Sequence, residues 1–235
     1  SENTMNQNTF NYRSLKECAL EFIRQMIITG ELKPGDVINE THLADNLNVS
    51  RPPIREAVAV LESENLVFKV PRKGIYVTDL TVEDLKEVYE MREMIECYSV
   101  KLMQQGNMGC IPEVSISIEE LLSLEEPTYN DSRQKMIYHN ASFRFHVELV
   151  KSCRNRLMLD CYNRIYYQLN RYQYLYYYLP GAKERAINEH KKILQLIENQ
   201  FYDKAIELLS SHIEYTREVM EEKVRETRQK KINTK

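Results

Sequence analysis

Residues 39–77 read NETHLADNLNVSRPPIREAVAVLESENLVFKVPRKGIYV, and this stretch decides the fold. Its first part has apolar residues at helical spacing, and Ser50 then stands where its hydroxyl can cap a second helix. Two prolines fall in the first turn of that helix, where a missing N–H costs little. Two short β-rich runs follow around the turn sequence PRKG. Two helices joined by a turn and followed by a hairpin predict a winged helix-turn-helix.

The second helix of this motif carries its basic residues on one side. Arg51 and Arg55 lie four residues apart and share a polar face, while Ile54, Val58 and Leu61 belong to an apolar stripe. A recognition helix of this kind enters the major groove of DNA with its N-terminal residues on the bases. The stretch therefore predicts a DNA-binding head.

Composition limits how such a head can bind. The chain has 235 residues and a formal net charge of −3, so no overall basic field attracts nucleic acid. DNA affinity must then come from a few placed contacts. The five cysteines are scattered without a C-x-x-C pair, which is typical of reduced thiols in a cytoplasm. No apolar stretch is long enough to span a membrane, so we expect a cytoplasmic protein that does not contact membranes.

The rest of the chain has nearly continuous helical periodicity. A first helix is expected over residues 12–30, and residues 37–38 are a candidate short strand that pairs with the hairpin. After the wing, the pattern predicts a long helix opening at Thr81, a weak helical piece at 118–124, and helices over 130–151, 154–178, 182–199 and 202–228.

These elements predict a mainly α protein with two domains. Residues 1–10 are expected to be a flexible leader, 11–79 the winged helix-turn-helix domain, 81–228 an all-helical bundle, and 229–235 a charged tail. One helix-turn-helix reads only half of a site, so we expect a homodimer whose spacing is set by the bundle.

Three histidines are the residues of the predicted bundle that could bind a ligand or metal. His190 and His212 each lie eleven residues from Phe201, so an antiparallel helix pair turning there brings them level. His146 sits on a third helix, one turn after Ser142. Three neutral imidazoles would suit a divalent transition metal, and Zn, Ni, Fe and Mn are not separated by the sequence. The alternative is three interior histidines, each bonded to a carbonyl or carboxylate.

Two further histidines and a tyrosine-rich segment are less informative. His139 precedes His146 by seven residues, roughly 10 Å along a helix axis, which is too far to share a metal. We expect it at the surface or lining a ligand pocket, and His42 facing solvent or near phosphate. The tyrosines over residues 162–178 favour packing at a helix interface over lining a pocket.

The segments NVSRPPIREAVAVLESENLV and PRKGIYV resemble the winged helix-turn-helix of GntR-family bacterial transcriptional regulators. The segments MREMIE, FRFHVELVKSCRN and INEHKKILQLIENQFYDKAIELLSSHI, in this order, resemble the FCD-type sensor domain of the FadR subfamily. The resemblance covers about residues 12–220. It implies a homodimeric repressor or activator that binds a palindromic operator in double-stranded DNA and responds to a small metabolite, usually an organic acid.

The resemblance also implies roles for residues of the head. Ser50, Arg51 and Arg55 match recognition-helix positions that meet DNA, and Gly74 matches the glycine at the wing tip. The adjacent wing residues Arg72 and Lys73 complete the predicted DNA-binding set.

In the sensor, Arg92 matches an arginine that faces the pocket in relatives and can bind a ligand carboxylate in a bidentate manner. The family's metal set is an Asp-x-x-x-His pair plus two later histidines. His146, His190 and His212 match the histidines, but Ser142 stands at the aspartate position and is assigned to effector binding. Because a neutral serine is a poor ligand, the metal is bound weakly, is completed by water or effector, or is absent.

The sequence leaves three functions to compare. The first is a ligand-responsive transcription factor. The second is a helical metal-dependent enzyme that uses the three histidines and an open coordination position. The third is a regulator whose sensor binds no metal. An enzyme would leave the DNA-binding head unexplained and offers no obvious partner base beside the histidines, so we predict no enzymatic activity.

Overall fold

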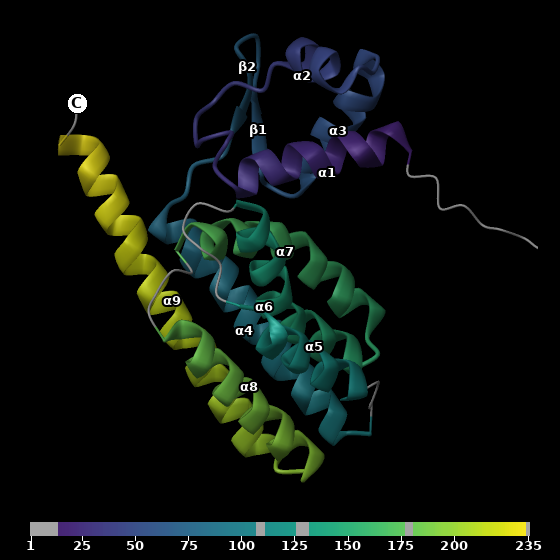
Figure 1. Cartoon of the computed structure of the whole chain (residues 1–235), viewed down its shortest axis with the longest axis vertical. Helices are drawn as coiled ribbons and strands as arrows, with labels where there is room; N and C mark the ends of the chain where they lie inside the picture. Colours follow the sequence, from purple (N-terminus) through teal and green to yellow (C-terminus); the bar gives the residue numbers. More distant parts are fainter. Residues whose placement is uncertain (1–13, 107–110, 126–131, 177–180, 234–235) are drawn as a thin grey trace, which may run out of the picture.

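The N-terminal head consists of three helices and a hairpin. Figure 1 shows a computed structural model of the protein, which describes residues 14–106, 111–125, 132–176 and 181–233. The predicted leader, residues 1–10, lies outside these ranges. The elements of the head are α1 (Leu15–Ile28), α2 (Glu40–Leu47), α3 (Arg51–Ser63), β1 (Val67–Val70) and β2 (Gly74–Val77).

Local chemistry explains where the head's helices begin. Ser14 and Glu17 form a reciprocal capping box at the start of α1, three residues beyond the first predicted helical position. The Asn39 side chain caps α2. Ser50 occupies the N-cap position of α3, but its hydroxyl makes no capping hydrogen bond, so the expected cap is wrong. Ser50 is exposed at the start of the predicted recognition helix.

The hairpin forms the wing. Its strands pair antiparallel with Val67 opposite Val77 and Val70 opposite Gly74. Gly74 has φ +130°, a conformation that L side chains rarely adopt, and this permits the turn at the wing tip. Val37 adds one bridge to Tyr76, as the sequence predicted. The core beneath the wing joins α1, α3 and β1 through residues such as Ile23, Ile54 and Val67.

The C-terminal domain is an all-α bundle (Figure 1). Its helices are α4 (Val82–Gln104), α5 (Ile111–Ser123), α6 (Ser132–Ser152), α7 (Arg156–Tyr176), α8 (Ala182–Glu198) and α9 (Tyr202–Asn233). α8 and α9 pack as an antiparallel pair, α9 also packs along α4, and α7 contacts both α4 and α1. A winged helix-turn-helix followed by a helical bundle confirms the predicted fold class.

Two helix boundaries differ from the sequence prediction. α5 begins at Ile111, seven residues before the predicted piece, because Pro112 fits in the first turn of a helix rather than interrupting it. α9 continues to Asn233, five residues beyond its predicted end, through a charged segment that carries ion pairs at three- and four-residue spacing.

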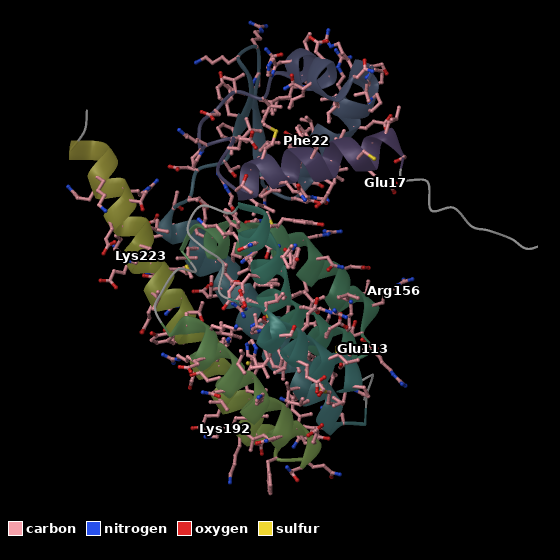
Figure 2. The ribbon with its side chains drawn as sticks, in the orientation of Figure 1. Glu17, Phe22, Glu113, Arg156, Lys192 and Lys223 are labelled. Atoms are coloured by element: carbon pink, nitrogen blue, oxygen red, sulfur yellow. The ribbon has the colours of Figure 1, made fainter. Side chains whose placement is uncertain are left out.

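The helical pair α8 and α9 presents charged side chains to the outside of the bundle. Lys192 on α8 and Lys223 on α9 project from the outer side of the helical pair (Figure 2). Within the described ranges, no helix combines the length and apolar character needed to cross a membrane.

Candidate functional site: a DNA-binding face and a buried sensor cavity

The predicted DNA-binding residues gather around a hollow between α3 and the wing. Arg51 and Arg55 come from the first turns of α3, and Arg72 and Gly74 come from the wing tip. Ser50, Arg51, Arg55, Arg72 and Lys73 are all exposed. The structure therefore brings the recognition helix and the wing to one open face.

One acidic residue on this face engages both arginines of the recognition helix. The Glu40 carboxylate, at the first position of α2, accepts a hydrogen bond from Arg55 Nε at 3.2 Å. The same oxygen lies 3.7 Å from Arg51 Nη2. Sequence analysis missed Glu40, because its reach to α3 depends on how the two helices cross.

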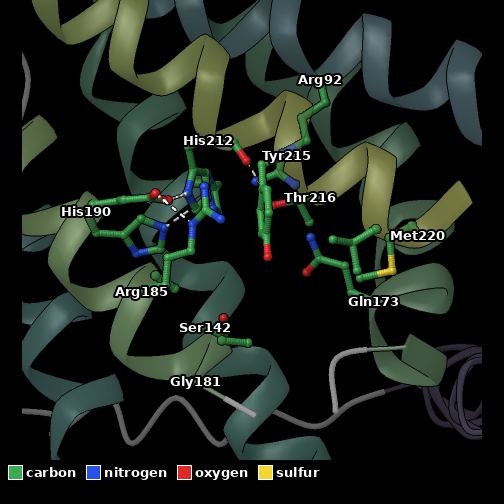
Figure 3. A pocket seen from close by; sticks show the side chains of 15 residues that line it. Arg92, Ser142, Gln173, Gly181, Arg185, His190, His212, Tyr215, Thr216 and Met220 are labelled. Carbon is green, nitrogen blue, oxygen red and sulfur yellow. Dashed lines mark hydrogen bonds and ion pairs between the residues drawn. The ribbon is translucent and has the colours of Figure 1, made fainter. Parts of the chain in front are cut away.

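The predicted sensor residues line a cavity of about 230 Å³ inside the bundle. Arg92 from α4, Ser142 and His146 from α6, His190 from α8 and His212 from α9 all border it. Figure 3 shows His190 and His212 close together on one side and Gln173 and Met220 on the other. The cavity is large enough for a small metabolite, and its lining combines charged and polar side chains with apolar ones such as Met220.

Arg92 is fully buried at this cavity and has a carboxylate partner one helical turn away. Its Nε donates to Glu96 Oε1 at 2.8 Å. In the described part of the chain, its Nη1 and Nη2 atoms have no hydrogen-bond partner. Burial alone would lower the pKa of Arg92, but the charge of Glu96 together with Tyr162, Tyr89 and the hydrogen bond to Glu96 raises it. Arg92 is therefore a cation with two unused donor groups.

Glu96 is the centre of a buried network. It accepts hydrogen bonds from Arg92, from the Tyr162 hydroxyl at 2.6 Å and from His146 Nδ1 at 2.8 Å. Burial alone would raise the pKa of Glu96, but Arg92 and His146 hold it below its usual value. An ionised carboxylate can only accept, so the His146 proton resides on Nδ1.

The three predicted histidines converge, and His190 and His212 lie level with each other, as the count from Phe201 predicted. His190 Nε2 and His212 Nε2 are 3.4 Å apart, and all three side chains offer ligand atoms within 4.8 Å of one another. His212 Nδ1 donates to Glu189 at 2.6 Å, and His190 stacks on Phe145. Burial lowers the pKa of His146 to about 3 and that of His190 well below its usual value.

This chemistry suits a metal ion. His146 and His212 each donate a hydrogen bond from Nδ1 to a glutamate, which leaves the lone pair of Nε2 available to a metal. Neutral imidazoles need not lose a proton before they bind a metal. The third ring, His190, has no hydrogen-bond partner for Nδ1 within the described residues, and its Nε2 lies 3.4 Å from His212 Nε2. Because His212 Nε2 carries no proton, this contact needs the His190 proton on Nε2, and binding a metal there would need that proton to move to Nδ1. The donor set therefore fits a divalent transition metal, with Ser142 where a carboxylate ligand would add charge.

Comparison with known proteins identifies the two domains. The family model described as bacterial regulatory proteins, gntR family, matches residues 15–77, and the FCD domain model matches residues 87–215. The chain belongs to the GntR family. It is a DNA-binding transcriptional regulator with an FCD domain, which confirms the family resemblance and the prediction that it is not an enzyme.

Several relatives of this GntR regulator cover most of its length. The uncharacterized HTH-type transcriptional regulator YdhC of Bacillus subtilis (strain 168) is 29% identical over 204 residues, which are 85% of this chain and 90% of the relative. The gluconate operon transcriptional repressor of Bacillus licheniformis is 27% identical over 61% of this chain and 57% of its own. The solved structure of E. coli McbR/YncC has the same fold, with a TM-score of 0.73 at 18% identity over 90% of this chain and 99% of that one.

The GntR regulator's head is joined to its sensor mainly through α7. The buried Arg24 of α1 forms an ion pair with Glu64, the residue that ends α3, and its guanidinium lies 3.9 Å from the centre of the Tyr167 ring. Gln168 donates to the Glu64 carbonyl at 3.1 Å. Arg171 donates to the carbonyl oxygen and the hydroxyl of Thr78, just after the wing.

The opposite side of α7 contacts the sensor network of this GntR regulator. Tyr162 bonds Glu96, and Gln173 lines the cavity. The described tyrosines of the tyrosine-rich segment thus pack at helix interfaces. His139 is buried and bonded to Asn170 of α7 at 2.9 Å, so its expected place at the surface or in the pocket lining is wrong. His42 is exposed, as expected.

Proposed function

We propose that this regulator binds a palindromic operator in double-stranded DNA as a homodimer and changes its DNA affinity when a small organic acid enters the bundle cavity. The observation that carries the effector assignment is the pair of unused Nη atoms on buried Arg92. A guanidinium binds a carboxylate through two parallel hydrogen bonds, and such a ligand would satisfy both donors. With DNA as its target, the protein would act in the cytoplasm.

The operator contacts are assigned to the start of α3 and to the wing. Arg51 and Arg55 reach the bases of the major groove, while Ser50, Arg72, Lys73 and the Gly74 backbone hold phosphates. The free Ser50 hydroxyl and the exposure of all four cations support this assignment.

A gel-shift experiment with the full chain and its own upstream DNA tests the operator contacts. Arg51→Ala and Arg55→Ala are each expected to weaken the shift about tenfold or more, because a bidentate base contact is worth about 1–3 kcal/mol. Lys192→Ala removes a cation from the outer side of α8 and is the matched control. An unchanged shift in both arginine variants would refute the contacts.

The homodimer follows from half-site recognition. Met91, Met94 and Tyr98 are exposed at three- and four-residue spacing along one side of α4. We propose that a second copy of the chain covers this side, since one head reads only half of a palindrome. Met94→Glu is expected to shift the protein toward monomer in sedimentation, whereas Leu157→Glu, at another exposed apolar position on α7, serves as the control. Equal masses for the two variants would exclude this interface.

A divalent metal is the proposed cofactor of the cavity. His146, His190 and His212 would hold it, and the ion would supply a Lewis-acid binding point for a carboxylate beside Arg92. Glu96 and Glu189 support this proposal because they orient two of the imidazoles and add negative charge that Ser142 does not provide. The alternative remains a metal-free sensor that binds its acid through Arg92 alone.

Metal analysis separates these two forms of the sensor. Protein purified without chelator is expected to contain about one transition-metal equivalent, and His190→Ala is expected to lose most of it. His139→Ala, which removes a buried imidazole outside the cavity, controls for the loss of a histidine. Identical metal content in all three proteins would favour the metal-free sensor.

A panel of small carboxylates tests the effector class directly. Binding to the folded state raises the melting temperature, so a true effector should stabilise wild type and change its operator affinity. Arg92→Met should abolish both effects, whereas Arg217→Met on α9 should retain them. Operator affinity that stays constant across the panel would argue against an organic acid.

α7 is the proposed link between effector and DNA. An effector that pulls on Arg92 also changes its bond with Glu96, to which Tyr162 of α7 is attached. The other side of α7 bonds Glu64, just after the recognition helix, and Thr78, just after the wing. Effector binding would therefore favour one orientation of the head over another, as population-shift logic requires.

A further inference from the structure

Glu40 is placed to act on the recognition helix rather than on the stability of the head. It is the first residue of α2, and its carboxylate reaches across to α3, where Arg55 Nε donates to it at 3.2 Å. The Arg51 and Arg55 side chains remain 53% and 61% exposed. Ion pairs this exposed contribute little to folding, because water solvates both charges nearly as well. The contact therefore needs a reason other than stability.

The geometry of the contact leaves the reading edge of Arg55 unoccupied. Glu40 takes the Nε–H, and no partner is recorded for either Nη atom of Arg55 among the described residues. A guanidinium reads guanine through two parallel donors directed at O6 and N7. Arg55 lines the hollow shared with the wing, and with Nε held by Glu40 its two Nη groups are the donors left for DNA.

Holding the side chain in place also reduces the entropy that binding must remove. A free arginine has four flexible torsions, and immobilising such a chain opposes association. The Glu40 carboxylate fixes the plane of the guanidinium before DNA binds. This removes part of the entropy cost, but only for a partner whose two acceptors lie in that plane. Guanine matches, whereas a phosphate can be approached from many directions.

We propose that Glu40 is a specificity-determining positioning residue, which holds Arg55 so that its Nη edge selects guanine in the operator half-site. This inference rests on the proposed role of Arg55 in DNA contact. Glu40 itself need not touch DNA. Its negative charge near the phosphates also weakens non-specific DNA binding. Glu40 thus increases the preference for the operator over other DNA in two ways.

The test compares base preference in charge-matched variants of the full chain. Wild type first selects its half-site from a random duplex library, and each guanine of the selected site is then replaced with 7-deazaguanine, which lacks the N7 acceptor. For wild type, one replacement should lower affinity about 5- to 100-fold. That guanine is assigned to Arg55 if the same replacement does not lower the affinity of Arg55→Ala. Glu40→Gln removes the carboxylate charge, and Glu56→Gln removes the same charge from an exposed position on α3.

Glu40→Gln is expected to reduce the 7-deazaguanine penalty at the Arg55 position to about threefold or less and to bind random DNA at least as tightly as wild type. Glu56→Gln should keep the full penalty. The inference is overturned if Glu40→Gln keeps the guanine penalty, or if it weakens binding to all sequences equally. If Arg55→Ala itself leaves every guanine preference intact, the proposed contact of Arg55 fails instead, so the two failures are distinguishable.

Discussion

The head and the bundle each contain an arginine whose Nε is held by a glutamate. In the head, Arg55 Nε lies 3.2 Å from Glu40 Oε2, and the two side chains are 61% and 19% exposed. In the bundle, Arg92 Nε lies 2.8 Å from Glu96 Oε1, and the two side chains are 1% and 0% exposed. Both pairs leave the Nη edge of the arginine free for a ligand. What differs is the surrounding medium, and this decides what each pair can do.

An exposed pair exchanges partners easily, whereas a buried pair does not. Two charges attract weakly in water and much more strongly in the interior, where each also needs a partner to offset its lost hydration. The head can therefore release or keep Arg55 as DNA requires. Arg92 stays in place, and its ligand must fit the cavity. This difference matches a surface that scans DNA and a pocket that selects one small molecule.

The largest expected effect comes from breaking the buried pair. Glu96→Gln leaves Arg92 as a buried charge without its counter-ion and should lower the free energy of unfolding by about 3–5 kcal/mol, measured by urea denaturation with chelator present. The double variant Arg92→Met, Glu96→Leu should recover much of this loss, because it removes both charges. A loss below about 1 kcal/mol in Glu96→Gln would mean that water reaches this network.

The second effect concerns a buried histidine outside the cavity. Burial lowers the pKa of His139 to about 4, against about 6.5 in the unfolded chain. Between these values the unfolded state binds more protons, so stability rises with pH and is lost on acidification. The loss attributable to His139 is about 3 kcal/mol by pH 4.

Unfolding measured between pH 7 and pH 4 checks this prediction. His139→Gln retains a donor for Asn170 and should show a shallower loss of stability on acidification than wild type. His42→Gln, on the exposed surface of α2, is the control for removing an imidazole. Parallel profiles for wild type and His139→Gln would contradict the buried assignment.

The junction between the two regions is intermediate in expected effect. Arg171 donates to the carbonyl and hydroxyl oxygens of Thr78, and hydrogen bonds from a charged donor contribute about 1.5–3 kcal/mol. Arg171→Ala should lower stability by about 2 kcal/mol and speed amide hydrogen exchange around residues 78–81. Lys192→Ala should do neither. Unchanged exchange at the junction would show that α7 does not hold the head.

The sequence predicted the features that local pattern determines. Periodicity located the recognition helix, and the equal count from Phe201 brought His190 and His212 level, because both depend only on helix geometry. The carboxylate partners of Arg55, His146 and His212 were missed because Glu40, Glu96 and Glu189 reach them across helices. How two helices are rotated against each other depends on the whole core, so no short pattern identifies such a contact. The bond between Arg92 and Glu96 is different, because the two residues lie four apart on α4 and sequence analysis overlooked a readable pair.

The helix boundaries also show which features local sequence determines and which depend on tertiary structure. The capping box of Ser14 and Glu17 is readable in the sequence, yet the apolar pattern extended the prediction past it. The predicted piece began only at residue 118, although Pro112 stands in the first turn of α5, where proline is tolerated. The unbonded Ser50 hydroxyl is a different case. A cap was expected from residue type alone, and the side-chain orientation that leaves it free is a tertiary property.

The smallest expected effect returns to the exposed pair. Glu40→Gln should change the free energy of unfolding by less than about 1 kcal/mol, because solvent compensates for the lost attraction. A double-mutant cycle with Arg55→Ala should give a coupling energy of the same small size, whereas the cycle on Arg92 and Glu96 should give several times more. If the two cycles gave equal couplings, the medium would not be what separates the pairs. If they differ as expected, any large change that Glu40→Gln causes in base preference must arise in the DNA complex, because the free protein has too little energy in this contact to account for it.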